Sequence, residues 1–205
     1  MEKVVQLAIK ELQAKYNPHT IILYGSVARN EATDTSDIDI ACFCDREDEV
    51  KDARIFHGIY LDAWIYPTSA LEEVPDTALR FADGIAVVDK QGYGKTYIDK
   101  VNKKLAKGVD KISDSDLAHV KAWLNKMLTR AAIDDMEGNY RRTWLQFELL
   151  ETYFKMRGLW FLGHKNSFSY LESNDPEAYA LFRHIYLNPK DHQSLEKLVQ
   201  YVMGQ

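Results

Sequence analysis

The sequence predicts an α+β fold in two parts, a mixed β-sheet with helices followed by an all-α helical bundle. Two observations lead to this prediction. Short apolar segments that alternate with polar residues are confined to the first part of the chain, as in strands that bury one face. From Ser113 onward, apolar residues recur at three- and four-residue spacing, as in long amphipathic helices. We therefore expect one domain over residues 1–110 and a second over 111–205.

Length and composition limit the class of protein. A chain of 205 residues with 46% hydrophobic content can bury two small cores. No apolar run approaches the roughly eighteen residues of a membrane span, and the charged amphipathic start lacks a signal-peptide core. We expect a cytoplasmic protein with no membrane partner. The net charge of −5 argues against a templated polymerase, because nucleic-acid binding draws most of its affinity from Lys and Arg.

The first elements follow from local patterns. Apolar residues at helical spacing predict a helix over residues 2–15 that packs on the sheet and ends at Asn17-Pro18. The stretch 21–43 then indicates a strand, a tight turn, a short helix, a loop and a second strand. This stretch carries the residues with the clearest chemistry.

Two carboxylates lie on the second predicted strand. Side chains two residues apart on a strand share a face, so Asp37 and Asp39 point the same way. They repel each other unless a cation lies between them, and oxygen ligands with room for phosphate oxygens suit Mg²⁺ better than zinc. At the preceding turn, Gly25 lets the backbone approach a ligand, and Ser26 begins a helix whose N–H groups can hold a phosphate.

The spacing of these residues resembles a known family. Gly25-Ser26, then ten residues, then D-x-D, within YGSVAR and SDIDI, resembles the nucleotidyltransferase superfamily that includes polymerase β, kanamycin nucleotidyltransferase and the small bacterial MNT proteins. The small bacterial members usually have Gly after the Arg of this motif, where this chain has Asn30. The departure is minor, because Asn tolerates the left-handed backbone region. The resemblance implies a palm-like catalytic domain with a carboxy-terminal helical bundle.

The family has a third carboxylate on a later strand. The segment Ile59 to Pro67 alternates apolar and polar residues, which predicts a strand with two distinct faces. Asp62 lies on the face opposite Leu61, Ala63 and Ile65 and is placed to join the first two carboxylates.

The resemblance implies a metal-dependent transfer reaction. An acceptor oxygen attacks the α-phosphate of an NTP, with ATP expected, pyrophosphate leaves, and the nucleoside monophosphate is transferred. Asp37 and Asp39 would hold one or two Mg²⁺ ions on the triphosphate, with Asp62 as a further ligand that helps to deprotonate the acceptor hydroxyl. Ser26 and backbone N–H groups around Gly25 would bind the β- and γ-phosphates. Additional positive charge there would come from Arg29.

The acceptor stays open between several classes, because enzymes with unrelated substrates share this fold and triad. Our first hypothesis is a small hydroxylated molecule such as an aminoglycoside or lincosamide, and thus antibiotic resistance, because an acidic protein suits a cationic antibiotic. One alternative is an MNT-type, antitoxin-like protein adenylyltransferase that acts on a HEPN partner. Another is a degenerate NTP-binding regulatory module, which the presence of all three carboxylates disfavours. Homodimer formation is also left open.

The rest of the first domain is less distinctive. The charged segment 45–54 is interpreted as a solvated connection between the second and third strands. A short capped helix is predicted at 69–73 and a strand at 86–89. The glycines of QGYG lack the phosphate-loop pattern and indicate a turn before a helix over 96–107.

The second domain is predicted to be a bundle of amphipathic helices whose aromatic residues form the core. The predicted boundaries are an N-cap at Ser113 or Ser115, a start after Gly138, an end at Arg157-Gly158, a start at Pro176, and a last helix over 191–202. Trp144 and Phe147 belong to the apolar pattern of the second helix.

Two features of the bundle have chemical interpretations. Glu148 lies on the apolar side of its predicted helix, an unusual place for a carboxylate without a polar partner. In antibiotic-modifying relatives a helical-domain Glu acts as general base, so Glu148 is our candidate and Glu151 the second choice. Arg157 and His164 loosely fit the spacing of HEPN-type ribonucleases. Gly158 and Gly163 indicate a loop there, so we expect no ribonuclease pair.

Overall fold

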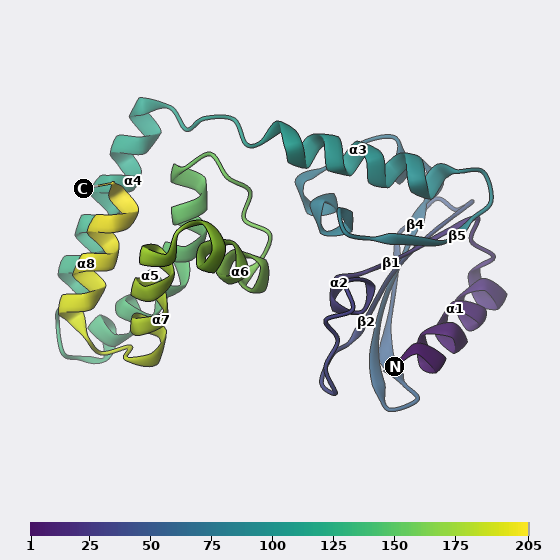
Figure 1. Ribbon diagram of the computed structural model, residues 1–205, viewed down its shortest axis with the longest axis horizontal. Helices are drawn as coiled ribbons and strands as arrows, with labels where there is room; N and C mark the ends of the chain where they lie inside the picture. The colour runs from purple at the N-terminus through teal and green to yellow at the C-terminus, as the bar shows by residue number, and fades with distance from the viewer. Residues whose placement is uncertain (205) are drawn as a thin grey trace. The chain divides into compact units, whose positions relative to one another are not determined.

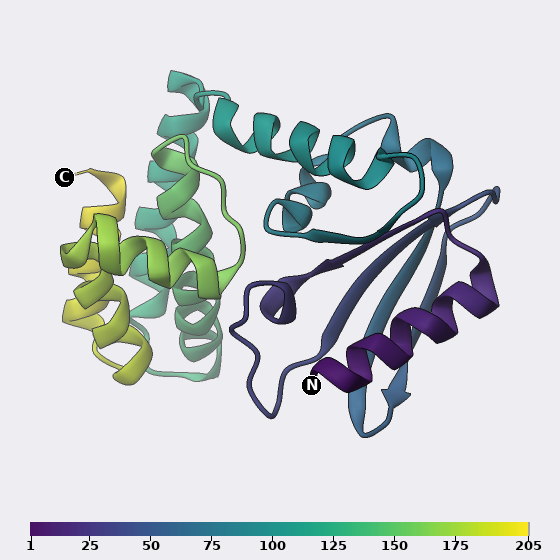
Figure 2. The same ribbon diagram turned by 45° about the vertical axis from the view of Figure 1, so that its right-hand side comes forward.

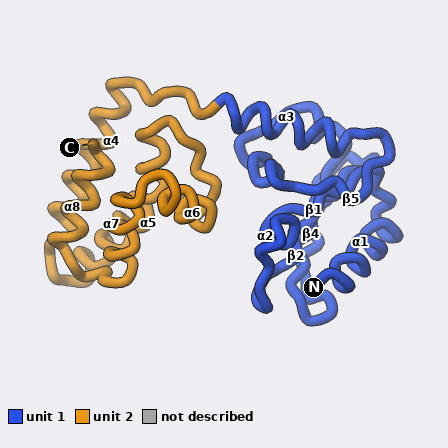
Figure 3. Tube along the Cα trace, viewed as in Figure 1, with its two compact units in different colours: residues 1–107 blue, residues 108–205 orange. Residues whose placement is uncertain are grey.

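The computed structural model describes residues 1–204 and has the predicted α+β fold. It divides into two compact units, one that ends at Lys107 and one that begins at Gly108 (Figure 3). The first unit holds a five-stranded mixed sheet with helices, and the described part of the second is helical (Figure 1). The boundary expected from the sequence was 110/111. Within residues 1–204, no helix has the length and apolar character needed to cross a membrane.

The sheet has the strand order β3-β4-β2-β1-β5. Its central pair, β2 and β4, is parallel, and the other neighbouring strands are antiparallel. The side chains of β2 and β4 therefore alternate in step between the two faces of the sheet. The strands are β1 (Thr20–Tyr24), β2 (Ile38–Cys44), β3 (Val50–Phe56), β4 (Ile59–Pro67) and β5 (Ile85–Asp89).

One face of the sheet is covered by the first helix, α1 (Glu2–Tyr16) (Figure 2). This helix ends where the sequence predicts, at Asn17, which adopts the left-handed backbone region with φ 46°. Its apolar stripe packs on the inward-facing residues of the central strands and forms a single core with them. The main members of that core are Val5, Ala8, Ile9, Leu12, Ile21, Leu23, Ile38, Ile40, Leu61, Ala63 and Ile65.

Helix α3 (Tyr93–Lys107) and the short 3-10 helix η2 (Asp76–Phe81) pack together, and both contact β1. On the face opposite α1, the ring of Phe81 meets that of Tyr24 at 4.9 Å between centroids, and Tyr97 of α3 meets Phe43 at 5.8 Å. A second 3-10 helix, η1 (Thr68–Leu71), lies where the sequence predicts a short helix at 69–73. The carboxylates singled out in the sequence belong to this face.

The interpretation of residues 45–54 as a solvated connection is wrong for its second half, which is β3. Asp52 of this strand is buried and accepts hydrogen bonds from Lys15 Nζ and Tyr16 Oη, both at 2.9 Å, and from Arg54 Nε. Burial alone would disfavour its charge, but these donors outweigh it and lower the pKa of the Asp52 carboxyl. The sequence did not indicate this strand because Asp52, on its inward face, interrupts the expected apolar pattern. Two partners of the Asp52 carboxylate, Lys15 and Tyr16, come from α1, which is distant in sequence.

The helix predicted over 96–107 begins three residues early, at Tyr93. The Asp89 carboxylate accepts hydrogen bonds from the backbone N–H groups of Gly94 and Lys95, at 2.9 and 3.1 Å, which satisfies the first turn of α3. The turn predicted at QGYG is therefore shorter than expected. Helix η2 was also missing from the sequence prediction.

The second unit packs its helices around one apolar core. Several predicted boundaries are confirmed: Ser113 caps α4 by accepting the Asp116 N–H at 3.1 Å, the second helix ends at Arg157, Pro176 opens a helix, and Asp191 caps the last. The helices are α4 (Asp114–Ala131), α5 (Met136–Met156), α6 (His164–Asn174), α7 (Pro176–Leu187) and α8 (His192–Met203).

Two expectations for the bundle are wrong. Gly138 lies inside α5 rather than before it, because Asp135 caps the helix by accepting the Gly138 N–H at 2.7 Å. A Cβ at Gly138 would lie 1.9 Å from the Ile133 carbonyl oxygen, so the residue is needed for this close approach. Helix α6 has no counterpart among the predicted helices.

The aromatic residues of α5 are divided between the core and the surface. Leu145, Leu149 and Phe154 are buried, as expected. Trp144 is 37% exposed and Phe147 is 74% exposed, so the prediction that the aromatic stripe is core is wrong for these two positions. They lie beyond the edge of the buried face, and the ring of Trp144 instead meets that of Trp123 edge to face at 5.7 Å.

Candidate active site

The sheet brings two of the predicted carboxylates side by side. Asp39 on β2 and Asp62 on β4 are register partners across the parallel pair, so their side chains leave the same face of the sheet. Asp37 immediately precedes β2, whereas the sequence placed it on the strand. It is exposed, while Asp39 and Asp62 are half-buried. The centre of the site is therefore the Asp39–Asp62 pair, with Asp37 at its open side.

The electrostatics of Asp39 favour a cation at this pair. Burial raises the pKa of the Asp39 carboxyl to about 6, and the neighbouring charges of Asp37 and Asp62 contribute in the same direction. Arg80 and Arg29 oppose the shift without cancelling it. A bound cation would remove the repulsion among the carboxylates and favour the ionised form of Asp39.

The turn after β1 touches the Asp39 carboxylate. Gly25 has a φ of +72°, in the left-handed region, and begins the single-turn helix α2 (Gly25–Ala28). A Cβ at Gly25 would lie 2.2 Å from Asp39 Oδ2. Both the backbone angle and the contact therefore require glycine. Gly25 therefore borders the Asp39 carboxylate, and Ser26 is the next residue of α2.

Arg29 and Asn30 complete this turn. Arg29 is the C-cap of α2, and its Nε donates a hydrogen bond to Glu31 Oε2 at 2.8 Å. It is half-buried and close enough to influence the pKa of Asp39. Asn30 has a φ of +58°, the conformation that the sequence argument required it to tolerate. Arg29 thus lies near the site, although a surface carboxylate already holds it.

Lys51 is a partner of the third carboxylate that was not predicted from the sequence. Lys51 lies on β3, opposite Trp64 in the antiparallel register with β4. Its Nζ is 3.2 Å from Asp62 Oδ1 and 4.7 Å from the centroid of the Trp64 ring. The signal for β3 in the sequence was the alternation of apolar and polar residues over 50–56. The charged residues of this segment made that alternation hard to recognise.

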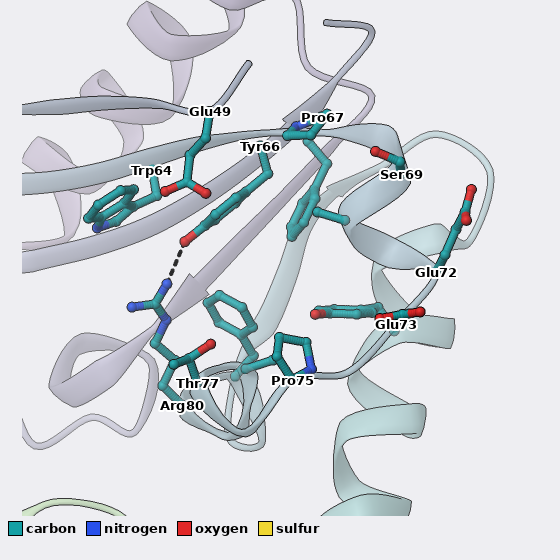
Figure 4. A pocket seen from close by; sticks show the side chains of 15 residues that line it. Glu49, Trp64, Tyr66, Pro67, Ser69, Glu72, Glu73, Pro75, Thr77 and Arg80 are labelled. Carbon is teal, nitrogen blue, oxygen red and sulfur yellow. Dashed lines mark hydrogen bonds between the residues drawn. The ribbon is translucent and has the colours of Figure 1, made fainter. Parts of the chain in front are cut away.

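Arg80 was also missed. Located on η2, it donates a hydrogen bond from Nη2 to Tyr66 Oη, drawn in Figure 4, and its guanidinium lies against the rings of Tyr24 and Phe81. Its charge lowers the pKa of Asp39 against the effect of burial. No local motif marks this residue, since it reaches the site through packing of η2.

The carboxylates are not preassembled as a metal cage. Within residues 1–204, no three His, Cys, Asp or Glu side chains are gathered closely enough to hold an ion. Asp37 is exposed and Asp62 is engaged by Lys51. The donor set still fits Mg²⁺, because this ion is usually bound by one or two carboxylates together with phosphate oxygens of the substrate. Asp37 and Asp39 can serve in that way without a third protein ligand.

Comparison with known proteins agrees with this geometry. Residues 7–73 match the family model described as Polymerase beta, Nucleotidyltransferase. This segment is a nucleotidyltransferase domain. It contains both the Gly25 turn and the paired carboxylates, so the matched segment includes the centre of the site built above.

Two further proteins are similar to this chain. A protein of Methanocaldococcus jannaschii named "Putative protein adenylyltransferase" is 48% identical over 40 residues, which is 20% of this chain and 41% of that protein. The match thus spans less than half of the relative's length. The crystal structure of a nucleotidyltransferase-like protein from Exiguobacterium sibiricum is 12% identical, with a TM-score of 0.44, over 100% of this chain and 74% of the other. A likeness that distant carries no argument about function.

The candidate residues of the helical unit have local partners. Glu148 is half-buried on α5 and accepts a hydrogen bond from Trp144 Nε1 at 3.3 Å, the polar partner that its position required. Glu151 is exposed. Arg157 donates to the backbone carbonyls of the last turn of α8, at 3.2 and 3.3 Å, and lies over the Tyr153 ring. These contacts give Arg157 a structural role in joining two helices.

The raised pKa of Asp39 predicts a pH-dependent effect of Mg²⁺ on stability. A folded-state pKa above the unfolded value stabilises the fold at low pH, and this contribution is lost as the pH rises through about 6. A cation at the carboxylates restores it. We therefore expect Mg²⁺ to raise the melting temperature more at about pH 7 than at about pH 5.

The measurement is thermal unfolding with MgCl₂ against NaCl of equal ionic strength at both pH values. Asp39→Asn should make the Mg²⁺ effect independent of pH. Asp34→Asn, at an exposed position in the preceding loop, is the matched control and should behave as wild type. An equal Mg²⁺ effect at both pH values in the wild type would show that Asp39 does not bind the ion.

Proposed function

We propose that the chain is a Mg²⁺-dependent nucleotidyltransferase that moves a nucleoside monophosphate, most simply AMP from ATP, to an acceptor hydroxyl and releases pyrophosphate. The observation that carries this proposal is the pairing of Asp39 with Asp62 in register on adjacent parallel strands, with the Gly25 turn against the Asp39 carboxylate. Such a reaction depends mainly on positioning and on neutralising charge, and this part of the sheet supplies groups for both.

The groups that would bind the phosphates lie in the turn after β1 and at the start of β2. Asp37 and Asp39 would hold Mg²⁺ together with the triphosphate oxygens, and the bound ion would neutralise charge on the phosphates. The Gly25 turn lets the backbone N–H groups approach the β- and γ-phosphates, with the Ser26 hydroxyl beside them. Arg29, released from Glu31, adds a positive charge at the same place.

The carboxylate that would act on the acceptor hydroxyl lies on β4. Asp62 would help to deprotonate the attacking hydroxyl, and it lies one strand away from Asp39, on the side away from the Gly25 turn. An in-line displacement needs the entering oxygen and the departing pyrophosphate on opposite sides of the α-phosphate, and this strand order supports that assignment of roles. Lys51 would hold the Asp62 carboxylate in position through their ion pair until the acceptor arrives.

For the acceptor, the proposal is a small hydroxylated cation of the aminoglycoside or lincosamide type, and hence a role in antibiotic resistance. The support is the net charge of −5, which attracts a cationic molecule and does not favour nucleic acid. A protein acceptor, such as a HEPN partner, is the second candidate. It is favoured by the name of the Methanocaldococcus jannaschii relative, which shares 48% identity over the matched segment.

One experiment separates these two candidates. The purified chain is incubated with Mg²⁺ and ATP labelled at the α-phosphate, either with a panel of aminoglycosides and lincosamides or with host lysate. Label in a small molecule supports the first candidate, and label in a protein band supports the second. Asp39→Asn is the control for both reactions. Absence of label from both, with ATP bound, would favour a regulatory module and contradict the proposal.

Glu148 is proposed as the general base of the helical unit. A positioned base contributes about 10²- to 10⁴-fold, so Glu148→Gln should lower turnover by that order while ATP affinity stays near normal. Glu151→Gln, a neighbouring exposed carboxylate on the same helix, is the matched control and should remain active. Turnover and ATP binding are measured on the same preparations. A fully active Glu148→Gln with a lowered melting temperature would make Glu148 a structural partner of Trp144.

The Arg157 and His164 positions test for a ribonuclease pair. We expect Arg157→Ala to lower stability, because it removes two hydrogen bonds to α8, and to leave turnover per folded molecule unchanged. His164→Ala should leave both properties unchanged. The wild-type chain is incubated with labelled RNA as a direct assay. RNA cleavage that His164→Ala abolishes would contradict this expectation.

A further inference from the structure

A cavity of about 610 Å³ opens on the same face of the sheet as the carboxylates, farther along β2 and β4. Figure 4 shows the side chains that line it. Its floor is formed by Phe43 of β2 and by Trp64 and Tyr66 of β4, and Tyr66 lies four residues beyond Asp62 on the same strand. The remaining walls are formed by residues of η1, η2 and α3, by the segment between η1 and η2, and by Glu49, which precedes β3. The volume is that of a site for a small organic molecule. None of the roles assigned above uses this space.

The floor of the cavity is an aromatic surface. The rings of Trp64 and Tyr66 are nearly parallel, with an interplanar angle of 12°, and the ring of Tyr66 stacks on that of Phe43 at 5.4 Å between centroids. Trp64 and Tyr66 are half-buried, so part of each ring faces the cavity. Aromatic faces carry partial negative charge and attract organic cations and flat or ring-shaped groups.

The charged residues of the wall are mainly acidic. Glu49 lies beside Trp64 and Tyr66, and Glu72 and Glu73 lie across the cavity (Figure 4). Among the described residues that line it, the one cation is Arg80, which already donates to the Tyr66 hydroxyl. The lining therefore carries a surplus of negative charge. It repels a triphosphate and attracts a cation.

The chain itself places an ammonium group at the edge of this surface. Lys51 Nζ lies between the Asp62 carboxylate, at 3.2 Å, and the Trp64 ring, at 4.7 Å from its centroid. This is the combination of carboxylate and aromatic face that binds organic amines. Lys51 thus shows that the Trp64 ring, at the edge of the cavity, is able to take an ammonium group.

We propose that this cavity is the acceptor subsite and that it takes a ring-bearing organic amine with a free hydroxyl. Asp62 and Trp64 are separated by about 7 Å along the strand, so a molecule seated on Trp64 can present a hydroxyl to Asp62. Trp64 and Tyr66 contact its ring, and Glu49 and Glu73 pair with its amines. The inference rests on the proposed function, because Asp62 has a role toward an acceptor only if transfer occurs.

The test uses the full chain labelled with 5-fluorotryptophan. Trp64 is the only tryptophan before residue 108, and the chain has 4 in all, so its ¹⁹F resonance can be assigned with Trp64→Phe. Kanamycin A, a ring-bearing polyamine with several hydroxyls, is titrated without nucleotide, and trehalose is the neutral sugar control. We expect a saturable shift of the Trp64 resonance with kanamycin A and none with trehalose at equal concentration.

Charge variants test the acidic wall. Exposed ion pairs contribute modestly to binding, so the loss of two of them in Glu49→Gln with Glu73→Gln should weaken kanamycin A binding by roughly tenfold. The matched control is Glu2→Gln with Glu47→Gln, two carboxylates outside the cavity, which changes the net charge equally. This control should retain wild-type affinity. An equal loss in both double variants would reduce the effect to general attraction and overturn the subsite.

The subsite and the transfer reaction fail in different ways. A Trp64 resonance that does not respond, in a chain that transfers label from ATP to a protein, overturns the subsite and leaves the transferase proposal standing. A Trp64 resonance that responds, in a chain that transfers no label to any acceptor, supports the cation site and contradicts the proposed transfer. The titration needs no nucleotide, so each result is read independently.

Discussion

Asp39→Asn is expected to abolish nucleotide transfer while the fold stays as stable as the wild type or becomes more stable. The substitution removes a proposed Mg²⁺ ligand, and a metal contributes several kcal/mol to such a reaction. It also removes a half-buried charge that burial and the neighbouring Asp37 and Asp62 disfavour, as the raised pKa of about 6 indicates. Turnover and thermal unfolding without Mg²⁺ are measured together.

The control for this prediction is Asp34→Asn, an exposed carboxylate in the loop before β2. It should keep wild-type turnover, so that any loss in Asp39→Asn cannot be assigned to net charge. More than about a tenth of wild-type turnover in Asp39→Asn would rule out a ligand worth several kcal/mol. A large loss of stability would mean that the Asp39 carboxylate holds the turn in place.

Gly25→Ala is expected to have the second largest effect, a fall in turnover of about 100-fold or more. The new Cβ would lie 2.2 Å from Asp39 Oδ2, so either the carboxylate or the turn must move. A displacement of about 1 Å in a catalytic constellation typically costs about 10²-fold. A positive φ also costs a residue with a side chain about 1 kcal/mol. Turnover and Mg²⁺·ATP binding are measured, and both should decrease.

The chain offers a matched control for the backbone part of this effect. Gly58, in the connection between β3 and β4, has a φ of +81°, and a Cβ there would meet no heavy atom within 4 Å beyond its own chain neighbours. Gly58→Ala therefore introduces comparable backbone strain without a collision at the carboxylates. It should lower stability slightly and leave turnover unchanged. If Gly25→Ala also retains turnover, the turn does not border the reacting phosphates.

The paired carboxylates were predictable because their placement is local. The two-residue period of a strand puts Asp39 and Asp62 on the faces opposite their buried apolar neighbours. That β2 and β4 are adjacent does not follow from periodicity, and the expectation came from the family resemblance. Lys51 and Arg80 could not be predicted, because each reaches the site through a pairing or packing contact distant in sequence. The aromatic cavity could not be predicted either, because its lining residues come from elements that are distant in sequence.

The errors in the helical unit have a different cause. Helix α6 buries chiefly Ser167 and Leu171, so its apolar stripe is too weak to mark a helix in the sequence. In α5 the reverse holds, because Trp144 and Phe147 look like core residues but lie on the exposed side of the helix. Apolar content alone does not distinguish a core face from a surface that carries aromatic groups.

The most direct test of the proposed reaction is to follow which phosphate of ATP reaches the acceptor. Parallel incubations use ATP labelled at the α-phosphate and ATP labelled at the γ-phosphate, each with Mg²⁺ and with the acceptor identified by the panel or the lysate. Nucleotidyl transfer predicts that the α-label enters the acceptor and the γ-label appears only in pyrophosphate, and that Asp39→Asn stops both. Label from the γ-phosphate in the acceptor would instead identify a kinase-type reaction and contradict the proposed function.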